Sequence, residues 1–273
     1  MIKKLLAAGK LSNVFVARPR QGADSKRVAL KNVGGSKHFA KIHGLGQHLY
    51  FQYLAMDLLG PTIYDIVKRP QMQKLSLSSV VKIGIQCLEI LSVLHSAGFA
   101  HGRICLENFA IGFNKETQRN LYLIDFSESK KIDNKNEYQT QENIQDGQLK
   151  DNALKYQQTN KCIQLVQNDL QDLLRMLMAL FRGVGEDQIK LSDIIENTLI
   201  EYAQIQSEII QLNIEISKID FESIGDYEEM IFVLRMMAES NRANLNLPFE
   251  WEVEIDQLTK KEIKNAKNKQ QQI

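Results

Sequence analysis

Cysteine is scarce in this sequence and is not arranged for pairing. The three cysteines, Cys87, Cys105 and Cys162, are far apart and odd in number. Disulfide frameworks and zinc sites use cysteines at short, paired spacings. The sequence therefore predicts neither kind of framework, and we expect a reducing, cytoplasmic compartment.

An excess of charge of one sign is also missing. The 34 lysine and arginine residues balance 33 aspartate and glutamate residues, which gives a formal net charge of +1. Such a chain has no long-range field to attract nucleic acid or an anionic membrane. Residues 1–9 are too quickly interrupted for a secretory signal, and no run approaches the roughly 20 apolar residues of a membrane span. We therefore expect neither nucleic acid nor a membrane as a partner.

The composition that remains is that of a globular protein with two unlike parts. Of the 273 residues, 44% are hydrophobic and 25% are charged, which is enough apolar material for a sizeable core. Residues 13–17, 27–31 and 49–56 are rich in β-branched and aromatic residues and predict short strands. Gly60 and Pro61 end this part of the chain, for which the sequence predicts a small antiparallel sheet.

Beyond Pro61 the apolar residues recur at helical spacing. One broad apolar face, which predicts a buried helix, is formed by Val80, Val81, Ile83, Gly84, Cys87, Leu88, Leu91 and Leu94. The other predicted elements are a strand at 121–125 and helices at 170–181, 194–219 and 228–237. Asp169 is predicted to cap the start of the helix at 170–181. The Gln- and Asn-rich segment 131–168 is predicted to be a long loop. The isoleucine-rich face of 194–219 is interpreted as core packing, with a partner-binding role as the second choice.

Several motifs resemble those of the casein kinase I family of protein kinases. Residues 56–65, Met-Asp-Leu-Leu-Gly-Pro-Thr-Ile-Tyr-Asp, are similar to the family's hinge, Met-Glu-Leu-Leu-Gly-Pro-Ser-Leu-Glu-Asp. Residues 94–109 are similar to its catalytic loop, with unbroken spacing. Further matches follow in order: residues 123–127 resemble the magnesium-binding Asp-Phe-Gly, 168–170 the Asp-Asp-Leu that opens a buried helix, and 249–251 the C-terminal Phe-Asp-Trp.

This resemblance implies an α+β, two-lobed protein-kinase-like fold. The implied parts are a small β-rich N-terminal lobe at 1–55, a hinge at 56–61, a larger helical C-terminal lobe at 62–257 and a basic tail at 258–273. Four glycines at 34, 35, 44 and 46 would each cost a helix about 1 kcal/mol, so we expect only a reduced helix αC within 32–48. We expect His38, His43 and His48 of this segment to be loop residues rather than metal ligands.

The resemblance places Arg103 where the family has its catalytic aspartate. A positioned base contributes on the order of a hundred- to ten-thousand-fold to the rate, and arginine cannot act as one because it has no acceptor and does not deprotonate. Cys105 stands where the family has a lysine that contacts the transferred phosphate. His101 is kept and is interpreted as structural. We therefore assign no catalytic residue.

The positions that would bind nucleotide are partly kept. The resemblance implies nucleotide contacts at Gly9, Lys31, Asp57, Leu59, Asn108 and Asp125, with Asn108 and Asp125 as Mg²⁺ ligands only if nucleotide binds. Gly9 is equally explained as a plain turn, Lys31 as a solvated strand lysine and Asp125 as a cap after a strand. No acidic residue lies between Asp24 and Asp57 to pair with Lys31. No cofactor is therefore required, and Mg-ATP binding is expected to be weak.

These changes predict a casein kinase I-like pseudokinase that acts as a protein-binding scaffold or docking module. The alternative is a weakly active ATP-dependent serine/threonine protein kinase that uses Glu107 as an unorthodox base. Relatives of the family occur on microtubules and in cilia, so a third interpretation is a component of a cytoskeletal or ciliary assembly, with microtubule or axonemal proteins as partners. The lysine-rich tail at 260–269 either contacts an acidic surface or is solvated.

Overall fold

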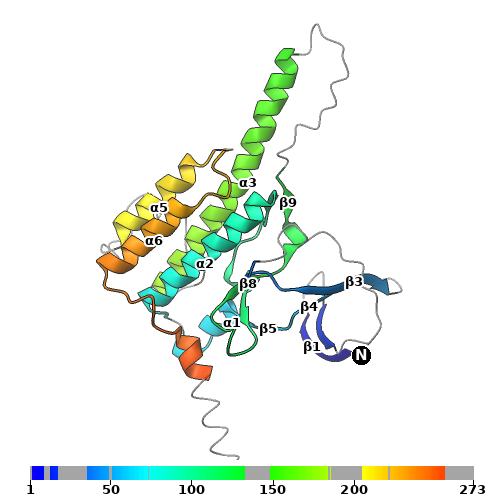
Figure 1. Cartoon of the computed structure of the whole chain (residues 1–273), viewed down its shortest axis with the longest axis vertical. Coiled ribbons are helices and arrows are strands. Elements are labelled where there is room, and N and C mark those ends of the chain that lie inside the picture. Colours follow the sequence, from blue (N-terminus) through cyan, green and yellow to red (C-terminus); the bar gives the residue numbers. More distant parts are fainter. Residues whose placement is uncertain are drawn as a thin grey trace, which may run out of the picture.

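The described part of the chain has a mixed α and β architecture (Figure 1). The computed structural model describes residues 2–8, 13–17, 36–48, 51–72, 74–132, 148–183, 185, 205–220 and 222–255. Helices and small antiparallel sheets in this arrangement are compatible with a kinase-like fold. The division into two lobes and a tail stays a prediction, and Gly9, Lys31 and the strand predicted at 27–31 lie outside the described residues.

Two antiparallel strand pairs form in the first part of the chain. β1 (Ile2–Ala8) pairs with β2 (Asn13–Ala17), and β3 (Ile42–His48) pairs with β4 (Phe51–Met56). The strand predicted at 13–17 is thereby confirmed, and the one predicted at 49–56 is confirmed over 51–56, since residues 49 and 50 lie outside the described residues.

The segment expected to hold a reduced helix αC contains a strand. Residues 36–41 form a turn and 42–48 form β3, while 32–35 lie outside the described residues. The expectation that His43 and His48 are loop residues was therefore wrong. Gly46 explains part of the strand, because it lies opposite Tyr53 of β4 and an added Cβ would lie 2.7 Å from the tyrosine hydroxyl.

A three-stranded antiparallel sheet joins the hinge to the rest of the chain. Its order is β5 (Leu59–Thr62), β7 (Phe109–Gly112) and β8 (Leu121–Leu123), so the predicted strand at 121–125 is confirmed in its first three residues. The hinge glycine Gly60 is needed for this pairing, since an added Cβ would lie 2.9 Å from the carbonyl oxygen of Gly112. α1 (Ile63–Val67) follows at once, and a reciprocal capping box between Thr62 and Asp65 starts it.

The predicted buried helix is α2 (Leu77–Ser96), and all eight of its predicted core positions are buried. Its mean hydropathy of 1.7 and its length would also suffice to cross a membrane, so the expectation that no run reaches that length was wrong. However, 61% of the apolar stretch of this helix is buried inside the protein, as in the core helix of a globular fold.

α3 (Gln148–Arg182) corrects the prediction of a long loop at 131–168. The helix begins about twenty residues before Asp169, which lies inside it and is not its cap. The buried residues Cys162 and Val166 extend the helical stripe that Leu170 continues, and the polar Gln, Lys and Asn residues around them tolerate a helix. Figure 1 shows the first part of α3 extending beyond the neighbouring helices.

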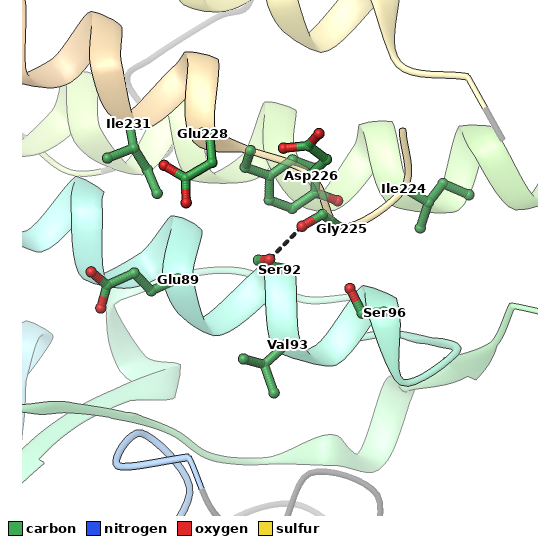
Figure 2. Close-up of a pocket in the computed structure, with 10 residues that line it drawn as sticks. Glu89, Ser92, Val93, Ser96, Ile224, Gly225, Asp226, Glu228 and Ile231 are labelled. Carbon is green, nitrogen blue, oxygen red and sulfur yellow. Dashed lines mark hydrogen bonds between the residues drawn. The ribbon is translucent and has the colours of Figure 1, made fainter. Parts of the chain in front are cut away.

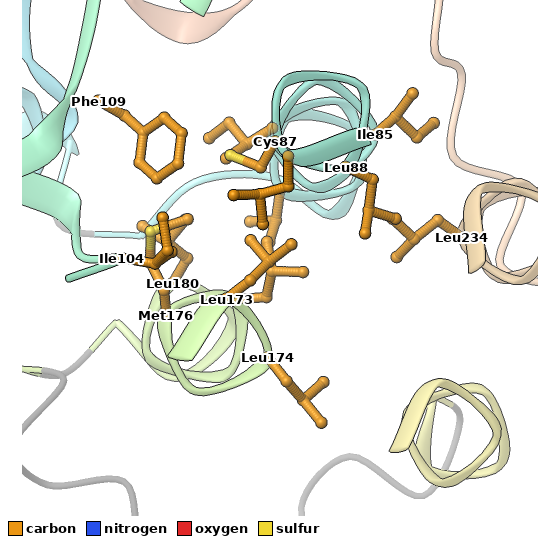
Figure 3. Close-up of a cluster of buried hydrophobic side chains, with 14 of the residues drawn as sticks. Ile85, Cys87, Leu88, Ile104, Phe109, Leu173, Leu174, Met176, Leu180 and Leu234 are labelled. Atoms are coloured by element: carbon orange, nitrogen blue, oxygen red, sulfur yellow. The ribbon is translucent and has the colours of Figure 1, made fainter. Parts of the chain in front are cut away.

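α5 (Gln206–Lys218) and α6 (Glu228–Ser240) complete the helical part, with α6 confirming the helix predicted at 228–237. Ile205, Ile209 and Ile216 are buried, which confirms core packing for the described end of the isoleucine-rich stripe; 194–204 lie outside the described residues. α2, α3 and α6 approach closely at Gly84, where an added Cβ would lie 2.9 Å from Leu234. Figure 3 shows the resulting core between these helices.

No disulfide joins the three cysteines, all of which the structure describes. Cys87 lies within the α2 face of this core, where burial raises the pKa of its thiol. Cys162 is buried on α3, and Cys105 is half-buried.

The C-terminal segment docks on the start of α2 and on the turn before β8. Trp251 is fully buried, stacks on Phe249 with ring centroids 4.1 Å apart, and donates from Nε1 to the carbonyl oxygen of Gln118 at 3.0 Å. The ammonium group of Lys82 on α2 lies 3.8 Å from the centre of the Phe249 ring. These contacts hold the last described residues against the helical core.

Candidate functional site

The segment that resembles a catalytic loop, residues 101–108, alternates between buried and exposed side chains. Ile104 and Leu106 are buried, whereas Arg103 before them and Glu107 after them are exposed. Figure 3 shows Ile104 and Phe109 packed among the side chains of α2 and α3. The buried side chains of Ile104 and Leu106 therefore anchor the loop to the core, and residues 103 and 107 face solvent.

The buried carboxylate of Asp169 holds the start of this loop. It is 1% exposed, and it accepts hydrogen bonds from the backbone N–H of His101 at 2.6 Å and of Gly102 at 2.8 Å. The Nε2 atom of His95 lies 3.0 Å from the same carboxylate. Hydrogen bonds to a buried charge are stronger than neutral ones, so this residue ties α3 to the loop. Sequence analysis had taken Asp169 for a helix cap.

His95 extends this network to α6. Its Nδ1 atom lies within hydrogen-bonding distance of the hydroxyl of Tyr227, at the start of α6, and the two rings meet edge to face with centroids 5.8 Å apart. The other ring nitrogen, Nε2, is the one that contacts Asp169. Burial raises the pKa of Tyr227, which keeps its hydroxyl a donor. One buried chain of polar groups thus joins α6, α2, α3 and the loop.

His101 is held in place by contacts on two sides. Its Nε2 donates to the carbonyl oxygen of Ile124 at 3.1 Å, and its ring meets Phe126 edge to face at 5.1 Å. Burial lowers the pKa of His101, although the negative charge of Asp169 partly opposes this effect. The ring is therefore neutral at pH 7, and its contacts support the structural role expected from the sequence.

Gly102 permits a close approach between the loop and the segment before β9 (Lys130–Lys131). Its φ angle is +82°, and an added Cβ would lie 2.6 Å from the carbonyl oxygen of Glu128. β9 pairs with β6 (Phe99–Ala100), and the hydroxyl of Ser129 donates to the carbonyl oxygen of His101. The loop is thereby clamped between Asp169 and this short sheet.

Arg103 occupies the position at which the resemblance expects a catalytic acid. Its side chain is exposed, and its guanidinium group forms no hydrogen bond or ion pair with any residue that the structure describes. Only its carbonyl oxygen is used, as the acceptor for the side-chain amide of Asn108 at 2.9 Å. The nearest carboxylate along the loop, that of Glu107, is exposed on η3 (Leu106–Asn108).

Asn108 and Asp125 come from neighbouring segments. Asn108 is 4% exposed, and its carbonyl oxygen accepts a hydrogen bond from the N–H of Ile124, which precedes Asp125. Asp125 is exposed, has a φ angle of +62°, and caps η4 (Phe126–Glu128) by accepting from the N–H of Ser127 at 3.4 Å. Both the cap and the ligand interpretations of Asp125 fit this position, and its role in binding Mg²⁺ stays a prediction.

The donor set at this position is small. Within the described ranges, no three His, Cys, Asp or Glu side chains are grouped so that they could hold a metal ion. Mg²⁺ needs near-octahedral oxygen coordination, and one carboxylate with one amide would leave most of the shell to water and to the phosphates of a nucleotide. The residues present thus fit a metal that arrives with its nucleotide.

In the hinge, the carboxylate of Asp57 contacts β3. It accepts a hydrogen bond from the backbone N–H of Lys41 at 3.2 Å and lies within hydrogen-bonding distance of Nε2 of His43. Leu59 is half-buried and pairs with Gly112 in the sheet. Both expected nucleotide-contact residues therefore also have structural partners, and Gly9 and Lys31 cannot be placed beside them because they lie outside the described residues.

His38 is a buried residue whose role the sequence did not indicate. It is 2% exposed, and its Nδ1 lies 2.8 Å from the carbonyl oxygen of Leu121 while its Nε2 lies 3.1 Å from the carboxylate of Glu89. It joins the turn before β3 to β8 and α2. A lone histidine in a glycine-rich segment gives no local signal for such distant partners.

Comparison with known proteins finds partial similarity to protein kinases. The chain is 28% identical over 123 residues to a probable serine/threonine-protein kinase of Dictyostelium discoideum, which covers 42% of this chain and 25% of that protein. It is 29% identical over 148 residues to casein kinase 1-like protein HD16 of rice, Oryza sativa subsp. japonica. This aligned region covers 44% of the present chain and 21% of the relative. No family model matches the chain. These similarities support a relationship with the kinase family, and the chain spans about a quarter or less of the length of these relatives.

Substitution of Gly102 tests the clamp on the loop. Gly102→Ala should lower the free energy of unfolding by more than Gly98→Ala, which serves as the matched control. Both glycines have positive φ angles, but the added Cβ at residue 98 would lie at an ordinary 3.6 Å from its nearest neighbour. Strain of this kind costs of order 1–3 kcal/mol, and the 2.6 Å contact at residue 102 adds to it. Urea denaturation, monitored by circular dichroism, measures the free energy of unfolding of both variants. Equal decreases in the two variants would show that the loop does not pack against Glu128.

Proposed function

We propose that this chain is a casein kinase I-like pseudokinase that acts as a protein-binding scaffold or docking module. The observation that carries the proposal is the exposed guanidinium of Arg103, which pairs with none of the described residues, at the position of the expected catalytic acid. Phosphoryl transfer to a hydroxyl needs an acceptor that orients or removes the proton. Arginine offers five donors and no acceptor, so it cannot do this.

The frame around Arg103 supports the scaffold part of the proposal. Asp169 holds the loop through the backbone N–H groups of His101 and Gly102, and these bonds do not depend on the side chain at residue 103. The loop can therefore keep its shape while its chemistry changes. A fold kept for its surfaces is consistent with this pattern, since function depends on sites and not on the fold alone.

The same geometry supports weak nucleotide binding as an accessory property and not as a requirement. The side-chain amide of Asn108 is committed to the carbonyl oxygen of Arg103, and the carboxylate of Asp125 caps Ser127. Each would have to share or exchange these bonds to enter a magnesium shell. We therefore propose that the protein needs no cofactor and that its affinity for Mg-ATP is in the millimolar range.

We place the scaffold in the cytoplasm, on a cytoskeletal or ciliary microtubule assembly, with microtubule or axonemal proteins as partners. The support is the lysine-rich sequence of 258–273, which includes Lys260, Lys261 and Lys264 and would be attracted to an acidic protein surface.

A phosphoryl-transfer assay tests the absence of catalysis. The chain is incubated with Mg²⁺ and radiolabelled ATP, with dephosphorylated casein as the offered substrate and with the chain itself as a second acceptor. We expect no incorporation above that of a heat-denatured sample, because the loss of the base removes about a hundred- to ten-thousand-fold in rate. Incorporation of labelled phosphate that is abolished by Asp125→Ala would contradict the proposal. If Glu107→Gln also abolishes this incorporation, Glu107 is the alternative base.

A thermal-shift titration tests nucleotide binding separately. With a millimolar dissociation constant, an equal concentration of Mg-ATP stabilises the folded state by only about 0.4 kcal/mol, so the melting temperature should rise by about 1 °C. Asp125→Ala should remove this rise, whereas Glu116→Gln, an exposed carboxylate outside the loop, should not. A rise of many degrees would contradict the proposed weakness of the site.

Co-sedimentation with stabilised microtubules tests the proposed setting. We compare the full chain with a chain that ends at Asp256. The full chain should pellet with microtubules, less so as salt is raised, and the shortened chain should remain in the supernatant because its lysines are removed. Equal pelleting of the two chains would show that the tail is not the contact. If neither chain pellets, microtubules are not the partner.

A further inference from the structure

A pocket of about 520 Å³ lies between the C-terminal half of α2 and the segment that leads into α6 (Figure 2). α2 contributes Glu89, Ser92, Val93 and Ser96, and residues 224–231 form the other wall. No residue of the loop at 101–108 lines it. We call it the α2–α6 groove.

The wall of the groove is fixed before any partner arrives. Gly225 has a φ angle of +88°, and an added Cβ would lie 2.1 Å from the hydroxyl of Ser96, so this backbone is packed directly on α2. The hydroxyl of Ser92 donates to the carbonyl oxygen of Gly225, as drawn in Figure 2. Tyr227, the next buried residue, is held by His95. A surface that needs no ordering loses less entropy when it binds.

The rim of the groove is acidic. Glu89, Asp226 and Glu228 line it, and none of its lining residues is lysine or arginine. Glu89 already contacts Lys37 and His38, but the carboxylates of Asp226 and Glu228 form no ion pair with any residue that the structure describes. The segment 220–229 carries five acidic residues and no basic one, although the net charge of the chain is +1. The negative charge is therefore local to this surface.

Apolar side chains lie beside the acidic ones. Val93, Ile224 and Ile231 line the groove; Val93 and Ile224 are half-buried, Ile231 is only 8% exposed, and the neighbouring Phe232 of α6 is 54% exposed. Phe232 and Glu228 are four residues apart and so lie on one face of the helix. The surface thus offers carboxylates for cations and an apolar floor for aliphatic groups within one groove.

We propose that the α2–α6 groove docks a basic linear segment of a partner protein. Its lysine or arginine side chains meet Asp226 and Glu228, and its apolar side chains contact Ile224 and Phe232. A phosphate-bearing partner such as nucleic acid or an anionic membrane would be repelled by the same carboxylates. The inference deepens the proposed scaffold function and rests on it only in taking the partner to be a protein.

The test uses a fluorescein-labelled short peptide of arginine and leucine interspersed with serine, titrated with the full chain and followed by fluorescence anisotropy. Exposed charge pairs contribute modestly, so Asp226→Asn combined with Glu228→Gln should weaken binding by about fivefold to tenfold. The matched control is Glu116→Gln combined with Glu239→Gln, which removes the same charge from exposed positions outside the groove. The control should bind like the unaltered chain, and a peptide with glutamate in place of arginine should not bind.

Equal weakening in the groove and control variants would overturn the proposal, because it would show attraction to charge in general. No binding by the unaltered chain would overturn it as well. Binding that appears only in a chain ending at Asp256 would do the same, since the occupant would then be this chain's own tail. None of these outcomes alters the result of the phosphoryl-transfer assay, so failure of the groove and failure of the pseudokinase proposal remain distinguishable.

Discussion

The arrangement of the helical part depends on one buried charge. The Asp169 carboxylate receives two backbone N–H groups from the loop and the imidazole of His95, which is bonded in turn to Tyr227. A buried carboxylate is tolerated only when its oxygens are satisfied, and its partners here come from the last turn of α2 and from two consecutive residues of the loop. The charge therefore fixes the relative positions of α2, α3, α6 and the loop together, because moving any one of them leaves the others with an unpaired polar group.

This kind of support separates the shape of the loop from its chemistry. The bonds to Asp169 use main-chain atoms, and the apolar anchors Ile104 and Leu106 point away from solvent. The exposed side chains of Arg103 and Glu107, on either side of these anchors, are not among the groups that hold the loop. An arginine at residue 103 therefore costs the fold little, and the sequence can lose an acidic side chain there without losing the loop.

The spacing of apolar residues was enough to predict the helices of the core. It did not predict the polar contacts that join these helices to one another and to the loop. α2 and the second half of α3 were predicted because their buried residues recur every three or four positions. The first half of α3 was missed because polar residues outnumber Cys162 and Val166, the two that continue the stripe. The partners of Asp169 and His38 lie more than fifty residues away along the chain, and a single sequence carries no local trace of such pairings.

The continuity of α3 has a mechanical meaning. A helix of 35 residues is about 50 Å long, and it has no proline at which it could bend. Its polar end extends past the neighbouring helices, and its other half holds Asp169 against the loop. Because the helix is continuous from Gln148 to Arg182, a displacement of its first turns would be transmitted along its axis toward the buried carboxylate of Asp169.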